Sequence, residues 1–203
     1  MIFPEPLKKG DNVFLFCPSS PIIPEEDIEK CKKVITDLGF NPVIGKSLYE
    51  NYGGYMAGKA EIRIEDLHKA FSRKNIKGIF CVKGGYSASQ LLDKIDYELI
   101  RNNPKVFVGY SDVTNLHIVF NQKCNLGTYH GPMVKSNMIN DFNEKDLRCL
   151  PENKRYGEKN HGCQPVARDV VSRRFDRFAD HFSEEFRIVR SALLPILMTP
   201  LRG

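Results

Sequence analysis

The stretch KVFVGYSDVTNLHIVF, residues 105–120, passes from an apolar strand to a helix through a single tight turn. Residues 106–109 are continuously apolar, which is typical of a strand buried on both faces of a parallel sheet. A helix is predicted directly after the turn, because apolar residues recur at helical spacing: Val113, Leu116 and Phe120. Ser111 lies at the apex of the turn, as in a nucleophile elbow. The alternative, that Ser111 only caps the helix, stays open at this point.

Apolar strands and amphipathic helices alternate through the rest of the first 147 residues. The further strands are predicted at 13–17, around 42–44, at 78–82 and in a run ending near Tyr129. The further helices are predicted from Pro24 to Leu38, over 60–71 and within 83–105. This alternation predicts an α/β fold with an open, mostly parallel sheet and helices on both faces. Ligands of such sheets bind beyond the carboxyl ends of the strands, so the loops at those ends form the candidate site.

A glycine pair follows the predicted strand at 78–82. Gly84 and Gly85 let the backbone approach a bound group closely, so their N–H groups suit an anion or a developing oxyanion. The pair belongs to neither GxGxxG nor GxxxxGK[ST], so the sequence supports neither a dinucleotide site nor a P-loop.

Three histidines of this region receive different interpretations. His130 lies in the segment TYHGP, residues 128–132, at the end of the predicted fifth strand. It is a candidate general base or substrate contact, with a plain wall residue as the alternative. His117 shares the apolar stripe of the helix after Ser111, which predicts a core position. His68 lies on the stripe of the helix over 60–71 and is predicted to be a packing or boundary residue.

Composition excludes several classes of protein. The 203 residues are 41% hydrophobic and 27% charged, which is typical of a globular chain and not of a disordered or collagen-like one. The start of the chain has no apolar run of the kind found in secretory signals, and the apolar stretch at 192–198 is too short to span a bilayer. Six cysteines without CxxC or paired metal-ligand spacing predict reduced thiols in a cytoplasmic protein.

The chain changes character at residue 148. Residues 1–147 hold 16 Lys, 3 Arg and 18 acidic residues (net +1), whereas 148–203 hold 2 Lys, 9 Arg and 7 acidic residues (net +4). We therefore predict an α/β domain over 1–147 and an Arg-rich tail over 148–203 that originates from a fusion, a frameshift or another added segment. The tail has apolar residues near helical spacing, which favours a helix packed on the domain. A basic membrane-surface or nucleic-acid patch is the alternative.

Three segments together resemble the LD-carboxypeptidase family of serine peptidases, which also includes the microcin immunity proteins. The segments are GDNVFLFCPSSP at 10–21, KGGYSASQLLDKIDYELIRNNPKVFVGYSD at 83–112 and TYHGPM at 128–133. A glycine pair, GYSD and HGP in this order are far more specific than any one of these motifs.

The resemblance implies a role for each residue at the strand ends. Ser111 matches the nucleophile of the family, and the backbone N–H groups of Gly85 and Asp112 match its oxyanion hole. Gly84 and His130 are candidate substrate contacts. Neither a metal nor an organic cofactor is implied.

Two departures from the family concern activity. Lys83 stands where the family usually has Arg before the glycine pair, so a bidentate contact with a carboxylate is lost. The Glu and His that complete the family's Ser-Glu-His triad belong to a second domain, and nothing after Leu147 matches that domain. We therefore expect this domain to be absent and the serine to be weakly activated.

The implied function is a serine carboxypeptidase that releases C-terminal D-alanine from muropeptides by cleaving an LD-amide bond, in cytoplasmic cell-wall recycling. A small peptide is the expected partner, whereas nucleic acid and membrane are not expected and a homodimer is left open. The alternatives are a microcin-type immunity peptidase that cleaves a peptide-nucleotide antibiotic and a non-catalytic binding remnant.

Overall fold

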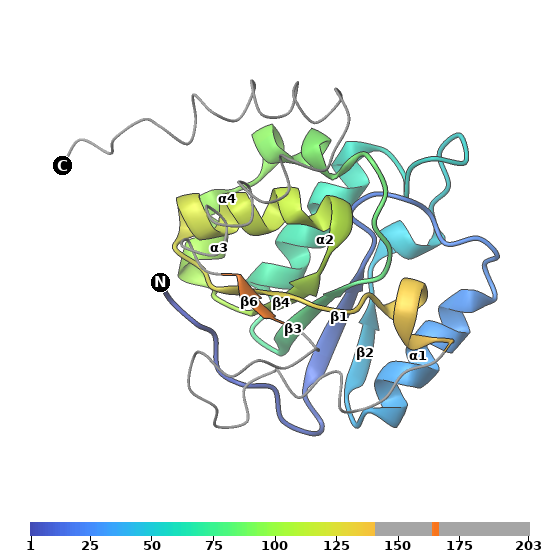
Figure 1. Cartoon of the computed structure of the whole chain (residues 1–203), viewed down its shortest axis with the longest axis horizontal. Coiled ribbons are helices and arrows are strands. Elements are labelled where there is room, and N and C mark those ends of the chain that lie inside the picture. Colours follow the sequence, from blue (N-terminus) through green and yellow to red (C-terminus); the bar gives the residue numbers. More distant parts are fainter. Residues whose placement is uncertain (141–163, 167–203) are drawn as a thin grey trace, which may run out of the picture. The chain divides into compact units, whose positions relative to one another are not determined.

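The computed structural model describes residues 1–140 and 164–166, all within one compact unit, Met1–Ala167. One six-stranded sheet has the order β2-β1-β3-β4-β5-β6 (Figure 1). Its strands are β1 Asn12–Phe16, β2 Asn41–Ile44, β3 Ile76–Cys81, β4 Val106–Gly109, β5 Thr128–His130 and β6 Gln164–Val166. The first five pair in parallel, and β6 pairs antiparallel with β5. The predicted open, mostly parallel sheet is confirmed.

The central strands are buried on both faces, as their continuous apolar runs predict. In β1, the side chains from Val13 to Phe16 have no exposed surface, and the same is true of Val106, Phe107 and Val108 in β4. Successive side chains of a strand point to opposite faces, so each central strand contributes to two separate apolar clusters.

Four α-helices cover the two faces of this sheet (Figure 1). They are α1 Asp27–Asp37, α2 Ala60–Ser72, α3 Tyr97–Asn102 and α4 Thr114–Cys124. The apolar cluster on one face includes side chains of α1, and the cluster on the other face includes those of α2, α3 and α4. The two layers of helices predicted from the alternation are therefore present.

Two helices differ in detail from the prediction. α1 begins at Asp27 and not at Pro24, because residues 24–26 form a turn in which the Asp27 N–H donates to the Pro24 carbonyl. The region 83–105 holds a 3-10 helix, Ala88–Lys94, in addition to α3.

The strand order reverses at the carboxyl ends of β1 and β3, where a ligand crevice is expected. After β1 the chain passes to β2 on one side, whereas β3 lies on the other side of β1. In open α/β sheets a ligand binds where the strand order reverses in this way. The loop of residues 17–21 follows β1 and the loop of residues 82–87 follows β3, so these two loops border the crevice.

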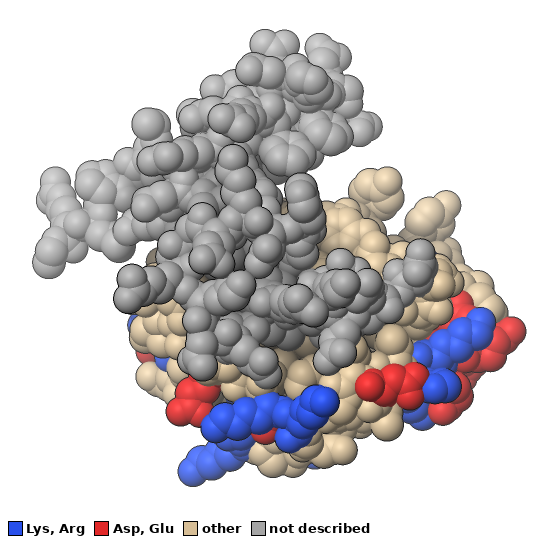
Figure 2. All heavy atoms as spheres, turned by 60° about the horizontal axis from the view of Figure 1, so that its bottom comes forward, with Lys and Arg blue, Asp and Glu red and all other residues tan. Residues whose placement is uncertain are grey.

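The exposed charges are of both signs. Figure 2 shows Lys and Arg beside Asp and Glu on the face that comes forward from the bottom of Figure 1. On α1, Lys32 pairs with Glu29 and Lys33 with Asp37, each at 2.6 Å. Such exposed pairs contribute little to stability.

Membrane spans, metal clusters and disulfides are absent from the described ranges. No helix there is long and apolar enough to cross a bilayer, and no group of His, Cys, Asp and Glu could hold a metal ion. The cysteines of these ranges are buried and free: Cys17, Cys31, Cys81 and Cys124. The predicted tail over 148–203, with Cys149 and Cys163, lies outside the described residues except for the three residues of β6, so its origin and its helix stay predictions.

His117 lies in the core, as its position on the apolar stripe of α4 predicts. Its Nε2 lies 2.9 Å from the Gly109 carbonyl oxygen, which can only accept, so Nε2 carries the proton. Its Nδ1 then accepts from the Thr128 hydroxyl at 2.9 Å. The pKa of His117 is lowered to about 4, chiefly by burial, while the bond to Gly109 opposes the shift and the charge of His130 adds to it. The ring is therefore neutral at pH 7.

We predict that acid destabilises the fold through His117. The unfolded imidazole, with a pKa near 6.5, takes up a proton between pH 6.5 and about 4, whereas the folded one does not. This residue should therefore reduce the free energy of unfolding by about 3 kcal/mol as the pH falls through that window. His117→Gln keeps one donor and one acceptor without the titration. Urea unfolding at pH 7 and pH 4 should show that the variant loses less free energy of unfolding on acidification than the wild type does. Equal losses in the two proteins would contradict the prediction.

Candidate functional site

Ser111 lies at a strained elbow between β4 and α4. Its φ is +61°, a left-handed conformation that non-glycine residues rarely adopt and that often occurs at functional positions. A 3-10 turn over Ser111–Val113 leads directly into α4. The turn requires glycine at 109, because a Cβ there would lie 2.8 Å from the Val113 Cγ1 atom. The predicted strand, tight turn and helix are thus confirmed.

The glycine pair lies against this elbow. A Cβ on Gly84 would stand 3.5 Å from the Ser111 Oγ atom and 3.4 Å from the Met133 Cε atom. The backbone of Gly84 therefore approaches the serine hydroxyl with no side chain between them. The glycine pair and the Ser111 elbow are separated in the sequence by a helix and a strand, and they meet at adjacent strand ends. The contact with Met133 was not predicted from the sequence.

The peptide between Gly84 and Gly85 has a fixed orientation. The Gly84 carbonyl accepts from the Ser20 N–H at 3.1 Å, on the side of β1. In a trans peptide the N–H points opposite to the carbonyl, so the Gly85 N–H points away from Ser20, toward the side of β4. No residue of the described ranges accepts a hydrogen bond from it. This N–H is a donor available to a ligand.

Glycine is required at position 85 itself. Its φ is +154°, and a Cβ there would lie 2.2 Å from the Ser20 Oγ atom and 2.5 Å from the Ser19 Oγ atom. Ser19 has no exposed surface, so its hydroxyl has little room to move aside. A side chain at this position would therefore displace the loop from the crevice.

Asp112 connects the glycine loop to the elbow. Its Oδ2 accepts from the Ala88 N–H at 2.9 Å, and its Oδ1 accepts from the Asn115 Nδ2 at 3.0 Å. The carboxylate is thus occupied by the protein itself. The Asp112 N–H lies in the first helical turn, where backbone donors have no acceptor within the helix, and the positive end of the helix dipole adds to its attraction for an anion.

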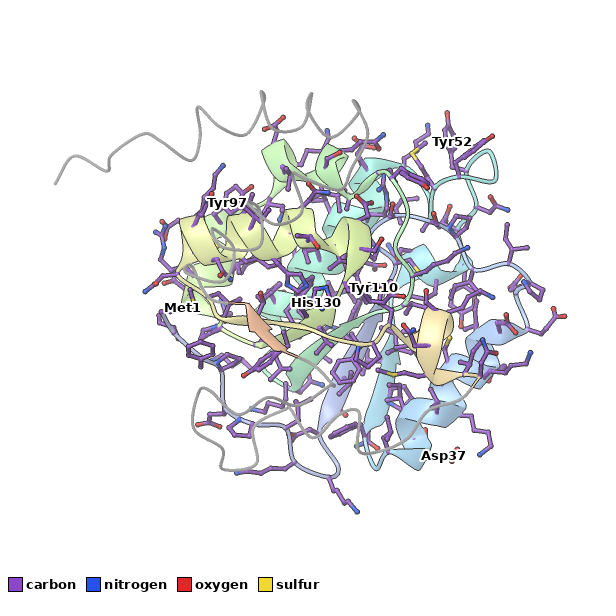
Figure 3. All side chains as sticks on the ribbon, in the orientation of Figure 1. Met1, Asp37, Tyr52, Tyr97, Tyr110 and His130 are labelled. Atoms are coloured by element: carbon purple, nitrogen blue, oxygen red, sulfur yellow. The ribbon has the colours of Figure 1, made fainter. Side chains whose placement is uncertain are left out.

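His130 lies at the end of β5, beside the elbow. It is paired in register with Gly109, and its ring centroid is 5.9 Å from that of Tyr110 (Figure 3). The structure therefore brings the half-buried His130 to the same edge of the sheet as Ser111, next to Tyr110.

No general base is joined to Ser111 within the described residues. No hydrogen bond links the Ser111 hydroxyl to another residue of those ranges. Both ring nitrogens of His117 are bonded elsewhere, and the His68 Nε2 accepts from the Asp96 N–H. His161 and His181 lie outside the described ranges.

Lys83 links the glycine loop to the loop after β1. Its Nζ donates to the Pro21 carbonyl oxygen at 3.3 Å, and the side chain is half buried. The lysine thus contacts the loop after β1, and its single amine cannot form the two parallel hydrogen bonds of a guanidinium with a carboxylate.

Sequence analysis missed Arg63, a buried side chain of the same edge. Its Nη1 donates to the Pro18 carbonyl at 2.8 Å and to the Ser87 carbonyl at 3.0 Å. A signal was present, because Arg63 shares the helical face of Ala60 and Leu67, where an apolar residue is expected.

Comparison with known proteins agrees with this arrangement. Residues 13–131 match the model of the Peptidase S66 family, described as the LD-carboxypeptidase N-terminal domain. This segment contains the glycine pair, the elbow and His130.

Individual relatives match over the same part of the chain. A probable murein peptide carboxypeptidase of Bacillus subtilis is 38% identical over 135 residues, which are 66% of this chain and 42% of the relative. The murein tetrapeptide carboxypeptidase of Pseudomonas aeruginosa is 33% identical over 123 residues, 60% of this chain and 39% of the relative. The crystal structure of an MccF-like protein from Bacillus anthracis superposes with a TM-score of 0.69 and 35% identity, over 76% of this chain and 48% of that one.

The chain spans less than half the length of each of these proteins. The family match nonetheless covers more than half of this chain. The chain therefore belongs to the LD-carboxypeptidase family, through the N-terminal domain of that family.

Proposed function

We propose that this chain supplies the nucleophile and the oxyanion hole of a serine LD-carboxypeptidase. Ser111 is the nucleophile, and the backbone N–H groups of Gly85 and Asp112 bind the oxyanion. The observation that carries the proposal is the strained Ser111 beside Gly84, next to a Gly85 N–H that no described residue accepts. Strained backbone clusters at functional sites, and unpaired donors beside a nucleophile can stabilise the oxyanion of acyl transfer.

The reaction is an acyl transfer in two steps. The Ser111 Oγ attacks the carbonyl carbon and its proton passes to a general base, while the two N–H groups stabilise the negative charge on the carbonyl oxygen. The C–N bond then breaks, the amine takes up the proton, and an ester to Ser111 remains. Water hydrolyses this ester and regenerates the hydroxyl. No described residue hydrogen bonds to the Ser111 hydroxyl. The proposal therefore requires a general base that does not contact Ser111 in this structure, or one outside the described residues.

The proposed substrate is a murein peptide that ends in D-alanine, cleaved at the amide between an L-centre and the D-residue. Support comes from the Bacillus and Pseudomonas relatives, whose names specify murein peptides. Gly84 and His130 would contact this peptide, since both lie at the edge of the sheet that carries Ser111. The proposal includes a cytoplasmic setting and needs neither metal nor organic cofactor.

We predict that the full chain releases D-alanine from muramoyl tetrapeptide and that Ser111→Ala abolishes this release. The reason is that the ester intermediate cannot form without the hydroxyl. Mass spectrometry of the released amino acid measures the reaction. A peptide-nucleotide antibiotic assayed in parallel tests the immunity-type alternative.

Each result of this assay has a definite meaning. Release that is lost in the variant supports the proposal and shows that a base reaches Ser111. Cleavage of the antibiotic alone would favour the immunity-type activity. No turnover of either substrate by the wild-type chain would contradict the proposal and favour a binding remnant.

We further predict that Gly85→Ala lowers kcat for D-alanine release by roughly 100-fold, since loss of one oxyanion donor has an effect of this size. The added Cβ would collide with the hydroxyls of Ser19 and Ser20 and displace the N–H. Gly10→Ala is a matched control, because Gly10 also has a positive φ, +89°, but no atom lies within 4 Å of an added Cβ. The control should lose about 1 kcal/mol of stability from backbone strain and keep its kcat. Equal kcat values for the two variants would argue against Gly85 as an oxyanion donor.

A further inference from the structure

Arg63 is a fully buried cation that joins two loops of the candidate site. It projects from α2 and has no exposed surface. Its Nη1 donates to the Pro18 carbonyl in the loop after β1, and to both the carbonyl and the hydroxyl of Ser87 in the loop after β3. Its Nη2 donates to the Gln90 Oε1 at 2.9 Å. One guanidinium thus spans segments that are 45 and 24 residues away in the sequence.

These bonds act close to the proposed oxyanion donor. Ser87 is two residues beyond Gly85, and its N–H donates to the Ser19 Oγ at 2.8 Å. Ser19 is in turn one of the two serines, with Ser20, against which Gly85 packs. On the opposite side, the Asp112 carboxylate holds the Ala88 N–H. The segment 84–88 is therefore held from the β1 side by Arg63 and Ser19, and from the elbow side by Asp112.

Simple core filling does not account for a charge at this position. No carboxylate of the described ranges forms an ion pair with Arg63, and its buried Nε has no hydrogen-bond partner there. Burial lowers the pKa of the guanidinium and the nearby Asp112 raises it, but arginine stays charged in proteins. A buried charge without an ion pair is costly, and an apolar residue of similar volume is often the more stable choice. What only arginine supplies is a rigid fork of donors that reaches both loops.

We propose that Arg63 is a positioning residue that holds the segment 84–88 so that the Gly85 N–H stays directed at the Ser111 side of the crevice. The inference deepens the proposed function and rests on it for its catalytic consequence. Arg63 does not touch the substrate. It acts through Ser87 and Pro18, whose backbone positions fix the loops on either side of Gly85.

The test uses Arg63→Lys in the full chain, which keeps the charge and loses the fork. Hydrogen exchange by mass spectrometry should show the Ser87 and Ala88 amides exchanging at least tenfold faster, with the amides of α1 unchanged. Because a small displacement of an oxyanion donor affects the transition state more than the bound substrate, kcat for D-alanine release should fall about 100-fold with KM within threefold.

Lys105→Met is the matched control. Lys105 is also a buried cation whose Nζ donates to two carbonyls, those of Arg73 and Ile76, but it lies at the amino ends of the strands. This variant should exchange faster near residues 73–76 and keep the kcat of the wild type. If Arg63→Lys does not fold, Gln90→Ala replaces it, since Gln90 is exposed and its loss frees only the Nη2 group. Gln90→Ala should also raise the exchange rates of the Ser87 and Ala88 amides and lower kcat, each by a smaller factor than Arg63→Lys.

The outcomes separate this inference from the proposed function. Unchanged hydrogen-exchange rates over residues 84–90 in Arg63→Lys would overturn the positioning role. A higher KM with an unchanged kcat would overturn it as well. A kcat loss of the same size in Lys105→Met would show that loss of any buried cation lowers kcat through general destabilisation. This result would also overturn the positioning role of Arg63. A wild-type chain without turnover would contradict the proposed function, and the exchange data alone would then decide whether Arg63 holds the loop.

Discussion

The hydrogen bond from the Ser20 N–H to the Gly84 carbonyl determines how the glycine loop faces the elbow. A planar trans peptide directs its N–H opposite to its carbonyl, so this one bond on the β1 side orients the Gly85 N–H toward the β4 side. The bond can form only because β1 and β3 are parallel neighbours whose carboxyl ends meet at one edge. Ser111 then reaches the same edge from β4, the next strand. Strand order thus brings the nucleophile and the donor together before any side chain contributes.

The strained backbone of Ser111 is held by well-packed surroundings. β4 is buried on both faces, and Val113 fills the space that a Cβ on Gly109 would occupy. The carbonyl of Gly109 accepts from both the Gly131 N–H at 3.1 Å and the His117 Nε2 at 2.9 Å. A left-handed serine persists only when its neighbours leave no easier conformation. The apolar clusters on the two faces of the sheet therefore fix the geometry of the polar edge.

Local patterns predicted most of this arrangement, because strands, helices and the elbow are specified by residues close together in the sequence. The runs at 13–17 and 106–109 were assigned within a residue of β1 and β4. The bonds of Arg63 and Ser19 were not predictable in this way, since they join residues 45 and 68 positions apart. An arginine on an apolar stripe indicates only that its position is unusual. Which carbonyls accept its hydrogen bonds depends on how the loops after β1 and β3 pack against α2, and periodicity carries no information about that packing.

His117 joins the elbow to β5 through one hydrogen bond at each ring nitrogen. As a neutral ring it donates to the Gly109 carbonyl and accepts from Thr128, and the Asn121 amide approaches the same Thr128 hydroxyl at 3.4 Å. Protonation would put a second donor on Nδ1, opposite a hydroxyl that would then have to reorient toward another acceptor. The rearrangement would begin at Thr128 of β5, because the Nε2 bond to the Gly109 carbonyl keeps its proton and its acceptor. Acid should therefore weaken the contact between α4 and β5 first, whereas the bond that supports the elbow two residues before Ser111 would persist.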